Sequence, residues 1–265
     1  MNILCCFKLV NDLDLVMEKD WRSATTTAVD LSYAKRLINC YDEAGLETAL
    51  RLKDEAEKRG ESAFISAVTV GDGNYETFFK NLFAVGIDRI LQIKTSANPP
   101  FAPDRISSLL FEAAKHCAHD VVITGIQSAD GTNGLTPYLL AQKLKIPCFA
   151  HVTELRYMQS GTLRVTSDTG RGLRHASVNR CALYAVGNSV NPYLRMATLK
   201  RKLAVSKMSA ELIEQENISN LGDRDVPVSN LSRENKTRSC TFITGESCEE
   251  KAKKLLKDFP EVNRA

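Results

Sequence analysis

The sequence predicts an α/β fold: a Rossmann-like parallel sheet with helices on both faces, a small antiparallel extension and an extended C-terminal arm. Three observations predict it. Strand and helix signals alternate through the first half of the chain. The strands of that half are apolar runs without alternation, which is typical of strands buried on both faces. Beyond Pro147, strand signals follow one another with glycines between them.

The alternating part begins with an apolar strand over residues 2–10. After an irregular stretch over 12–31, apolar residues at helical spacing predict a helix over 42–59, and Gly60 ends it. The next elements follow in regular order: a strand over 63–70, a helix over 75–85, a strand over 89–93, a helix over 103–117 and a strand over 121–124. This order predicts a parallel sheet with crossover helices.

The second half changes character. Four strand signals, over 148–156, 162–167, 172–179 and 181–186, predict the antiparallel extension. From residue 169 to residue 210 the chain carries basic residues and no acidic one. A weak strand signal over 241–244 and a helix over 249–257 close the chain. Residues 206–265 hold too few apolar residues to fold alone, so we expect an α/β domain over 1–205 and an arm over 206–265 that packs on a partner.

Composition limits the classes of function. The 265 residues are 43% hydrophobic and 25% charged, with a net charge of +3, so nothing in the balance favours a nucleic-acid partner. No apolar run is long enough to span a bilayer. The N-terminus lacks the features of a signal peptide. The eight cysteines form no C-x-x-C pair, so we expect free thiols in a cytoplasmic protein. The four histidines show no metal-ligand spacing beyond the His116/His119 pair, which we interpret as surface or interface histidines.

The segment over 120–144 carries the strongest functional signal. A β-branched run ends at Gly125, a polar loop with Gly131 and Gly134 follows, and a helix opens with Thr136 as N-cap and Pro137 as first helical residue. Unpaired N–H groups at a helix N-terminus bind phosphate, and glycines with positive φ let a ligand approach the backbone. An ordinary strand-to-helix turn is the alternative interpretation.

Other motifs are incomplete. Gly71-Asp72-Gly73 follows a strand, but Glu76 stands where a dinucleotide fingerprint needs its third glycine, and the chain contains no P-loop sequence. No serine or cysteine lies in a nucleophile elbow, and we find no set of catalytic residues. A nucleotide-sized site without acid, base or nucleophile indicates a protein that holds a cofactor rather than an enzyme.

Four segments resemble the β subunit of electron transfer flavoprotein (the ETF β/FixA family). They are NILCCFK at 2–8, NCYDEAGLETALRLKDEA at 39–56, AVTVGDGNYETFFKNLFAVGIDRILQI at 67–93 and GIQSADGTNGLTPYLLAQKLKIP at 125–147. A weaker match runs from 181 to 207. Together they cover most of residues 1–207, in the family's order.

The resemblance implies a heterodimer with an α subunit, and that the α subunit makes most of the contacts to a redox-active FAD. It also implies that this subunit binds AMP, or a second FAD as in electron-bifurcating members. The positions that match the family's nucleotide contacts are Cys6, Asn39, Cys40, Tyr41, Asp42, Val70, Gly125, Ile126, Gln127, Ser128, Ala129, Asp130, Gly131, Thr132, Asn133, Gly134, Leu135 and Thr136. For Tyr41, a place near the α-subunit flavin and simple core packing both remain open.

Several positions depart from the family pattern. Cys40 replaces a proline, and Thr132 and Leu135 occupy positions that are often acidic and glutamine. Loss of an acidic group lowers repulsion toward additional phosphates, so AMP and a second FAD both stay open. Leu199 matches the leucine that docks on partner dehydrogenases, but Lys200 follows it where proline is usual.

The leading hypothesis is a non-catalytic subunit of a heterodimeric electron carrier, which passes electrons from a dehydrogenase to an acceptor. On this hypothesis the basic stretch, Arg171 to Lys207, faces the α subunit, a redox partner or the nucleotide phosphate; as an alternative, it is a solvated surface. The alternative function is an adenine-nucleotide-binding regulatory module without a redox role. A nucleotide-activating enzyme ranks last, because the loop has no lysine or histidine for the phosphates.

Overall fold

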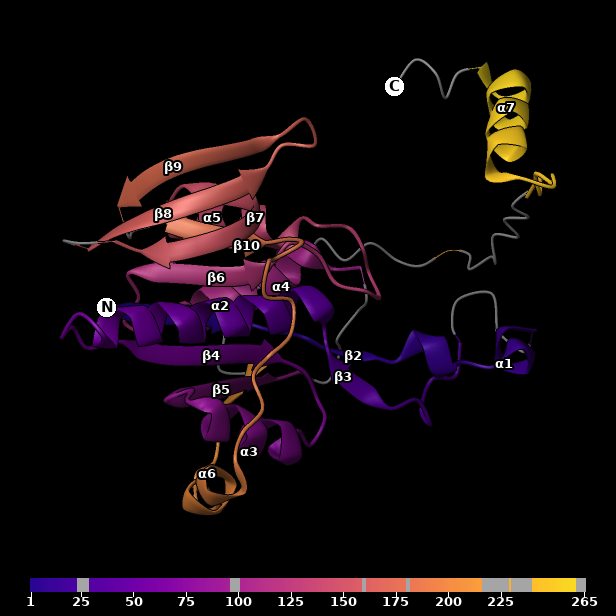
Figure 1. Cartoon of the computed structure of the whole chain (residues 1–265). Helices are drawn as coiled ribbons and strands as arrows, with labels where there is room; N and C mark the ends of the chain where they lie inside the picture. Colours follow the sequence, from indigo (N-terminus) through magenta and orange to yellow (C-terminus); the bar gives the residue numbers. More distant parts are fainter. Residues whose placement is uncertain are drawn as a thin grey trace. The chain divides into compact units, whose positions relative to one another are not determined.

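The computed structural model describes residues 1–22, 29–95, 101–158, 161–179, 182–215, 229 and 240–260. The chain divides into two compact units, Met1–Asn230 and Leu231–Ala265. The first unit contains all the described strands (Figure 1). The described part of the second contains one helix, α7 (Cys248–Asp258), whose N-cap is Ser247.

The first unit is built on a nine-stranded sheet, in the order β11-β5-β4-β1-β6-β10-β7-β8-β9 (Figure 1). From β11 to β7 every neighbouring pair is parallel, and β7-β8-β9 is antiparallel. The strands are β1 (Asn2–Cys6), β4 (Phe64–Val70), β5 (Arg89–Lys94), β6 (Val121–Gly125), β7 (Cys148–Tyr157), β8 (Thr162–Asp168), β9 (Leu173–Asn179), β10 (Ala182–Val186) and β11 (Glu211–Glu214). The predicted parallel sheet with an antiparallel extension is confirmed.

Helices cover both faces of this sheet, because its central strands are apolar on both sides. Ile3 and Cys5 of β1 pack in the core cluster under α2 (Cys40–Glu57) and α3 (Glu76–Val85). Leu4 and Cys6 point the other way, into the cluster that includes α4 (Pro103–Lys115) and α5 (Thr136–Leu144). Alternate residues of one strand therefore belong to two cores, as expected for a Rossmann-like fold.

The strand order creates a crevice beside β1. The chain leaves β1 through α2 to reach β4 on one side, continues to β5, and then returns through α4 to β6 on the other side of β1. Connections thus depart in opposite directions at β1 and β6, which makes a topological switch point. Ligands of open α/β sheets bind outside the carboxyl ends of the strands at such a point.

Two strand predictions are corrected by the structure. The segment 181–186 was expected in the antiparallel extension, but β10 lies between β6 and β7 and pairs in parallel with both. All five residues of β10 are buried and nonpolar, as an interior strand requires. The expected strand over 2–10 ends at Cys6; Leu9–Asn11 forms β2, which pairs with β3 (Arg36–Ile38) in a separate two-stranded sheet.

The C-terminal part gives a mixed outcome. The predicted strand over 241–244 is wrong, because those residues are not in a strand. The predicted final helix is present as α7. Residues 211–214 form β11, which pairs with β5 and is held there by two hydrogen bonds from Arg89 to the Glu211 carboxylate, at 2.8 and 2.6 Å. Packing of the 206–265 arm on a partner stays a prediction.

Three short helices complete the described elements. They are η1 (Leu13–Leu15), α1 (Glu18–Arg22) and α6 (Leu199–Ala204). The Gly71-Asp72-Gly73 turn serves packing: a Cβ at either glycine would collide with the ring of Tyr75, which lies against the turn. The structure therefore explains this glycine pair without a dinucleotide.

Candidate nucleotide site

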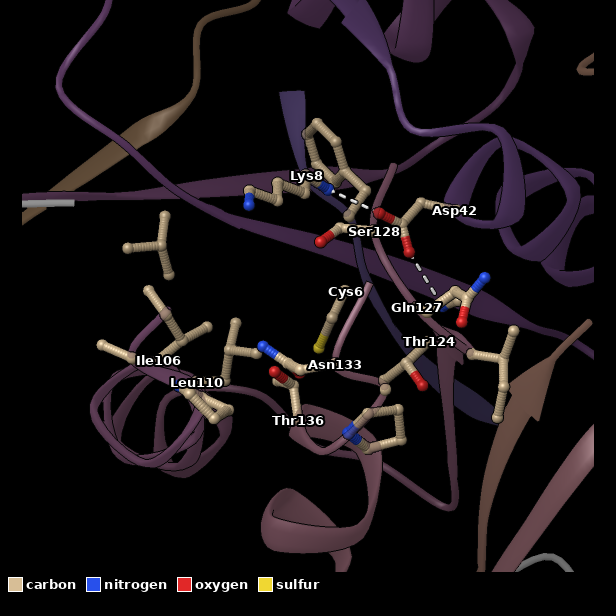
Figure 2. Close-up of a pocket in the computed structure, with 18 residues that line it drawn as sticks. Cys6, Lys8, Asp42, Ile106, Leu110, Thr124, Gln127, Ser128, Asn133 and Thr136 are labelled. Atoms are coloured by element: carbon tan, nitrogen blue, oxygen red, sulfur yellow. Dashed lines mark hydrogen bonds between the residues drawn. The ribbon is translucent and has the colours of Figure 1, made fainter. Parts of the chain in front are cut away.

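A pocket opens at the carboxyl ends of β1, β4 and β6, at the switch point. It encloses about 780 Å³ of space open to solvent. One wall is apolar and comes from β4 and α4, with Val70, Ala102, Pro103, Ile106 and Leu110. The opposite wall is the loop between β6 and α5 (Figure 2). An apolar wall facing a polar loop suits a ligand with a flat apolar end and a charged end.

The loop between β6 and α5 carries both bonded backbone N–H groups and ones that bind no described residue. Several of its amides are already bonded: Ile126 donates to the Val186 carbonyl and Leu135 to the Asn133 side chain. Among the loop residues that line the pocket, those whose N–H groups make no hydrogen bond to any described residue are Gln127, Ser128, Asn133, Gly134 and Thr136. Together with the N-terminus of α5, these groups form a candidate anion site.

The start of α5 differs in detail from the sequence prediction. Thr136 is the first helical residue rather than the N-cap; Leu135 is the N-cap, and its side chain makes no capping bond. The N–H group of Thr136 therefore stays available to a ligand, whereas Pro137, the next residue, has none. Positive φ occurs at Gly134 (61°) and Thr132 (47°), but not at Gly131. Of the two predicted glycines, only Gly134 needs the left-handed conformation.

Asn39 and Asp42, at the start of α2, hold the loop in place. The Asn39 amide donates to the Gln127 carbonyl at 2.8 Å and accepts from the N–H of Ala129 at 3.1 Å. The Asp42 carboxylate accepts from the N–H of Gly125 at 2.8 Å and from the N–H of Lys8 at 2.9 Å (Figure 2). It also accepts from the Asn39 amide at 3.1 Å. These bonds join the ends of β1 and β6 to α2.

Burial governs the charge of this carboxylate. Desolvation raises the pKa of Asp42 to about 6, and the hydrogen bonds from Asn39, Lys8 and Gly125 oppose that rise. Gly125 leaves the room that Asp42 needs: a Cβ there would overlap Asp42 Oδ1 and lie 2.9 Å from Tyr41 Cβ. A side chain at residue 125 is therefore incompatible with this arrangement.

The predicted site residues divide into two groups. Those that line the pocket are Cys6, Asp42, Val70, Gly125, Ile126, Gln127, Ser128, Asn133, Gly134 and Thr136. Those that do not line it are Asn39, Cys40, Tyr41, Ala129, Asp130, Gly131, Thr132 and Leu135. Among the second group, Asn39 supports the loop, Cys40 and Leu135 are exposed, and Tyr41 packs against the core on the α4 and α5 side.

Two polar residues that sequence reasoning did not select also line the pocket. Lys8 follows β1, lines the pocket, and its Nζ pairs with Asp130 Oδ2 at 2.7 Å. Thr124 of β6 also lines it; its Oγ1 is buried and has no hydrogen-bond partner among the described residues (Figure 2). The signal for Lys8 is a lysine directly after a buried strand, at the sheet edge where ligands bind. Nothing in the local sequence marks Thr124.

Similarity to known proteins identifies the family of this chain. The family model described as "Electron transfer flavoprotein domain" matches residues 26–214. The chain belongs to the electron transfer flavoprotein family. It is 29% identical over 261 residues, 98% of this chain and 97% of the relative, to YgcR of Escherichia coli, by its name a candidate electron transfer flavoprotein subunit. It is 35% identical over 124 residues, 46% of each chain, to the electron transfer flavoprotein subunit beta of Bacillus subtilis. The Methylophilus methylotrophus subunit beta is 24% identical over 196 residues, 73% of this chain and 72% of that subunit.

The sequence resemblance is thus confirmed, and a role in electron transfer goes with membership of the electron transfer flavoprotein family. No described helix has the length and apolar character to cross a membrane. No group of three or more metal-ligating side chains occurs among the described residues.

Leu199, the predicted docking residue, is the first residue of α6 and is 74% exposed. Large exposed apolar side chains surround it in sequence, namely Tyr193, Met196 and Leu203. We name residues 188–204 the exposed segment. None of the basic residues of the exposed segment lines the pocket. The pocket therefore gives no support to a role of the exposed segment in phosphate binding.

Arg195, in the middle of the exposed segment, forms ion pairs with acidic residues of α2. Arg195 donates from Nε and Nη2 to the two oxygens of Glu47, at 3.1 and 3.0 Å, and from Nη1 to Asp54 at 2.7 Å. The Glu47 side chain is only 4% exposed. The Leu194 N–H donates to the Glu43 carboxylate at 3.1 Å. Arg195 therefore serves the fold rather than a free surface.

Proposed function

We propose that this chain is the β-type subunit of a heterodimeric electron transfer flavoprotein and that its pocket holds an adenine nucleotide. The observation that carries the proposal is the pocket at the switch point, with free loop amides on one side and an apolar wall on the other. An adenosine fits between Val70, Ile106 and Leu110, and a phosphate fits the amides at the α5 N-terminus.

The Thr124 hydroxyl supports the presence of a ligand. Thr124 is only 5% exposed, and its Oγ1 has no hydrogen-bond partner among the described residues although it lines the pocket. A buried hydroxyl without a partner is unfavourable, so such groups usually bind a ligand or water. A ribose hydroxyl or a ring nitrogen of a nucleotide would satisfy it.

The redox chemistry belongs to FAD, which we place mainly on an α subunit. We assign the pocket of this chain to a nucleotide rather than to a catalytic step. The similar β subunits carry a name that implies an α partner. When bound, the flavin accepts and donates electrons. The residues of this chain hold the nucleotide and present the exposed segment around Leu199 to a donor dehydrogenase.

Purification of the two subunits together tests this proposal. We expect co-expression with the α subunit to give a yellow complex of one copy of each, and nucleotide extracted from it to contain FAD and AMP. One flavin with one AMP per complex indicates a simple carrier, whereas two flavins place a second FAD in this pocket. A colourless chain that does not bind the α subunit and carries no adenine nucleotide contradicts the proposal.

A matched pair of glycine variants locates the ligand. Gly134→Val adds a branched side chain at a left-handed residue of the loop, so bound nucleotide should be lost. Gly170→Val makes the same change at a residue with φ of 73° and open space around it, away from the pocket lining. Nucleotide content that falls equally in both variants would mean that the loop is not the binding site.

A further inference from the structure

Lys8 is the one cationic side chain among the described residues that line the pocket. Its ammonium group is held by Asp130, with Nζ 2.8 Å from Oδ1 and 2.7 Å from Oδ2. Asp42, the one acidic residue in the lining, already accepts three hydrogen bonds from the protein. Apart from the Asp42 carboxylate, the charge that a ligand meets at the pocket is therefore set by Lys8 and Asp130.

The place of Asp130 is unusual for an anion site. It does not line the pocket itself, but it belongs to the loop whose free N–H groups form the candidate anion site. A carboxylate in that loop repels a phosphate. Its pairing with Lys8 removes that repulsion only while the pair is intact. Both side chains are partly exposed, at 30% and 28%, and exposed pairs contribute little to stability. The ion pair can therefore separate at a small cost in free energy when a phosphate binds Lys8.

We infer that the Lys8–Asp130 pair determines how much phosphate charge the pocket accepts. On binding, the ligand phosphate takes Lys8 Nζ from Asp130, and the released carboxylate then repels every further negative charge. The site therefore takes a nucleoside monophosphate in preference to a diphosphate. This inference rests on the proposed function, because it concerns the same adenine-nucleotide pocket (Figure 2).

Affinities for three ligands of increasing charge test the inference. Adenosine, AMP and ADP are titrated into the full chain and its variants by calorimetry. In Asp130→Asn we expect unchanged affinity for adenosine, about threefold to tenfold tighter AMP, and a larger gain for ADP, because charge pairs near the surface are worth factors of this size. In Lys8→Met we expect AMP to bind about tenfold more weakly, since a charge-assisted hydrogen bond is lost.

Two controls separate direct contact from general charge effects. Glu112→Gln neutralises a carboxylate of similar exposure (27%) in a similar pair with Lys115 at 2.7 Å, on α4 and outside the pocket lining, so nucleotide affinity should not change. The double variant Lys8→Met/Asp130→Asn should bind AMP more weakly than Asp130→Asn alone, because the phosphate loses its contact with Nζ.

The outcomes distinguish this inference from the proposed function. If the unchanged chain binds neither adenosine nor AMP, the proposed function fails, and the inference fails with it. If the unchanged chain binds AMP but both Lys8→Met and Asp130→Asn bind AMP and ADP as it does, only the inference is overturned. A Glu112→Gln effect as large as that of Asp130→Asn overturns it as well. Thermal unfolding of each variant verifies that the fold is retained.

Discussion

Replacement of Gly125 by alanine tests how closely α2 and β6 approach each other at the pocket. A Cβ at this residue would overlap Asp42 Oδ1 and lie 3.0 Å from the backbone nitrogen of Asp42. The backbone cannot yield cheaply there, because the Gly125 N–H donates to the same carboxylate at 2.8 Å. The methyl group must therefore push the start of α2 away from β6.

The magnitude follows from two costs. Overpacking of a tight site costs about 1–3 kcal/mol. Loss of a hydrogen bond to a charged group adds about 1.5–3 kcal/mol. We expect Gly125→Ala to lower the free energy of unfolding by about 3–5 kcal/mol, a large part of the roughly 5–15 kcal/mol of a typical domain. Urea denaturation followed by circular dichroism measures it.

Gly45→Ala is the matched control for this prediction. Gly45 lies in α2 and faces the same strand, but its Cβ would meet Ile123 Cγ2 at 3.3 Å, a contact that a small shift relieves. Alanine also stabilises a helix interior by up to about 1 kcal/mol relative to glycine, so this variant should remain within about 1 kcal/mol of the parent. If Gly125→Ala is as stable as Gly45→Ala, the close approach at residue 125 does not constrain the fold.

Three further predictions concern Asp42, Thr124 and Arg195. The folded pKa of Asp42, about 6 against an ordinary 3.8, means that its contribution to stability is fully present below pH 3.8 and is lost as pH rises through 6. The parent should therefore lose about 3 kcal/mol relative to Asp42→Asn between pH 3 and pH 7, at 1.36 kcal/mol per pKa unit, and parallel stability curves would contradict this. Thr124→Val should weaken AMP binding about tenfold while the ligand-free chain becomes about 1 kcal/mol more stable, because a buried unpaired hydroxyl is removed; a less stable variant would mean that the hydroxyl has a partner. Arg195→Ala leaves the buried Glu47 with too little compensating charge and should cost about 2–4 kcal/mol by urea denaturation. The exposed Lys200→Ala is its control and should cost almost nothing.

The sequence predicts the fold well where burial dictates residue type. Apolar runs such as Val121–Gly125 can only be interior strands, and their alternation with helices predicts the parallel sheet. The position of β10 was predicted wrongly because it follows β9 in the chain, and neighbouring strands were expected to pair. The sequence signal for an interior strand is a run of five hydrophobic residues, ALYAV, without polar alternation.

The site was predicted in part. The loop after β6 was found through its glycines and helix start, since those features are local in sequence. Lys8 and Asp130 are 122 residues apart, and no local pattern indicates that they meet. The resemblance assigned Asn39 and Asp42 to a nucleotide, whereas the structure gives both a part in holding the loop. Their contact with a ligand remains a prediction.

Helix α2 links the pocket to the exposed segment through a fixed length of chain. Its first turn carries Asp42, and its later turns carry Glu47 and Asp54, which bind Arg195. Asp42 and Asp54 are about 18 Å apart along the helix axis, at 1.5 Å per residue. A single inserted residue between Asp42 and Glu47 would turn the acidic pair by about 100° and break the anchor. This stretch therefore tolerates neither insertion nor deletion.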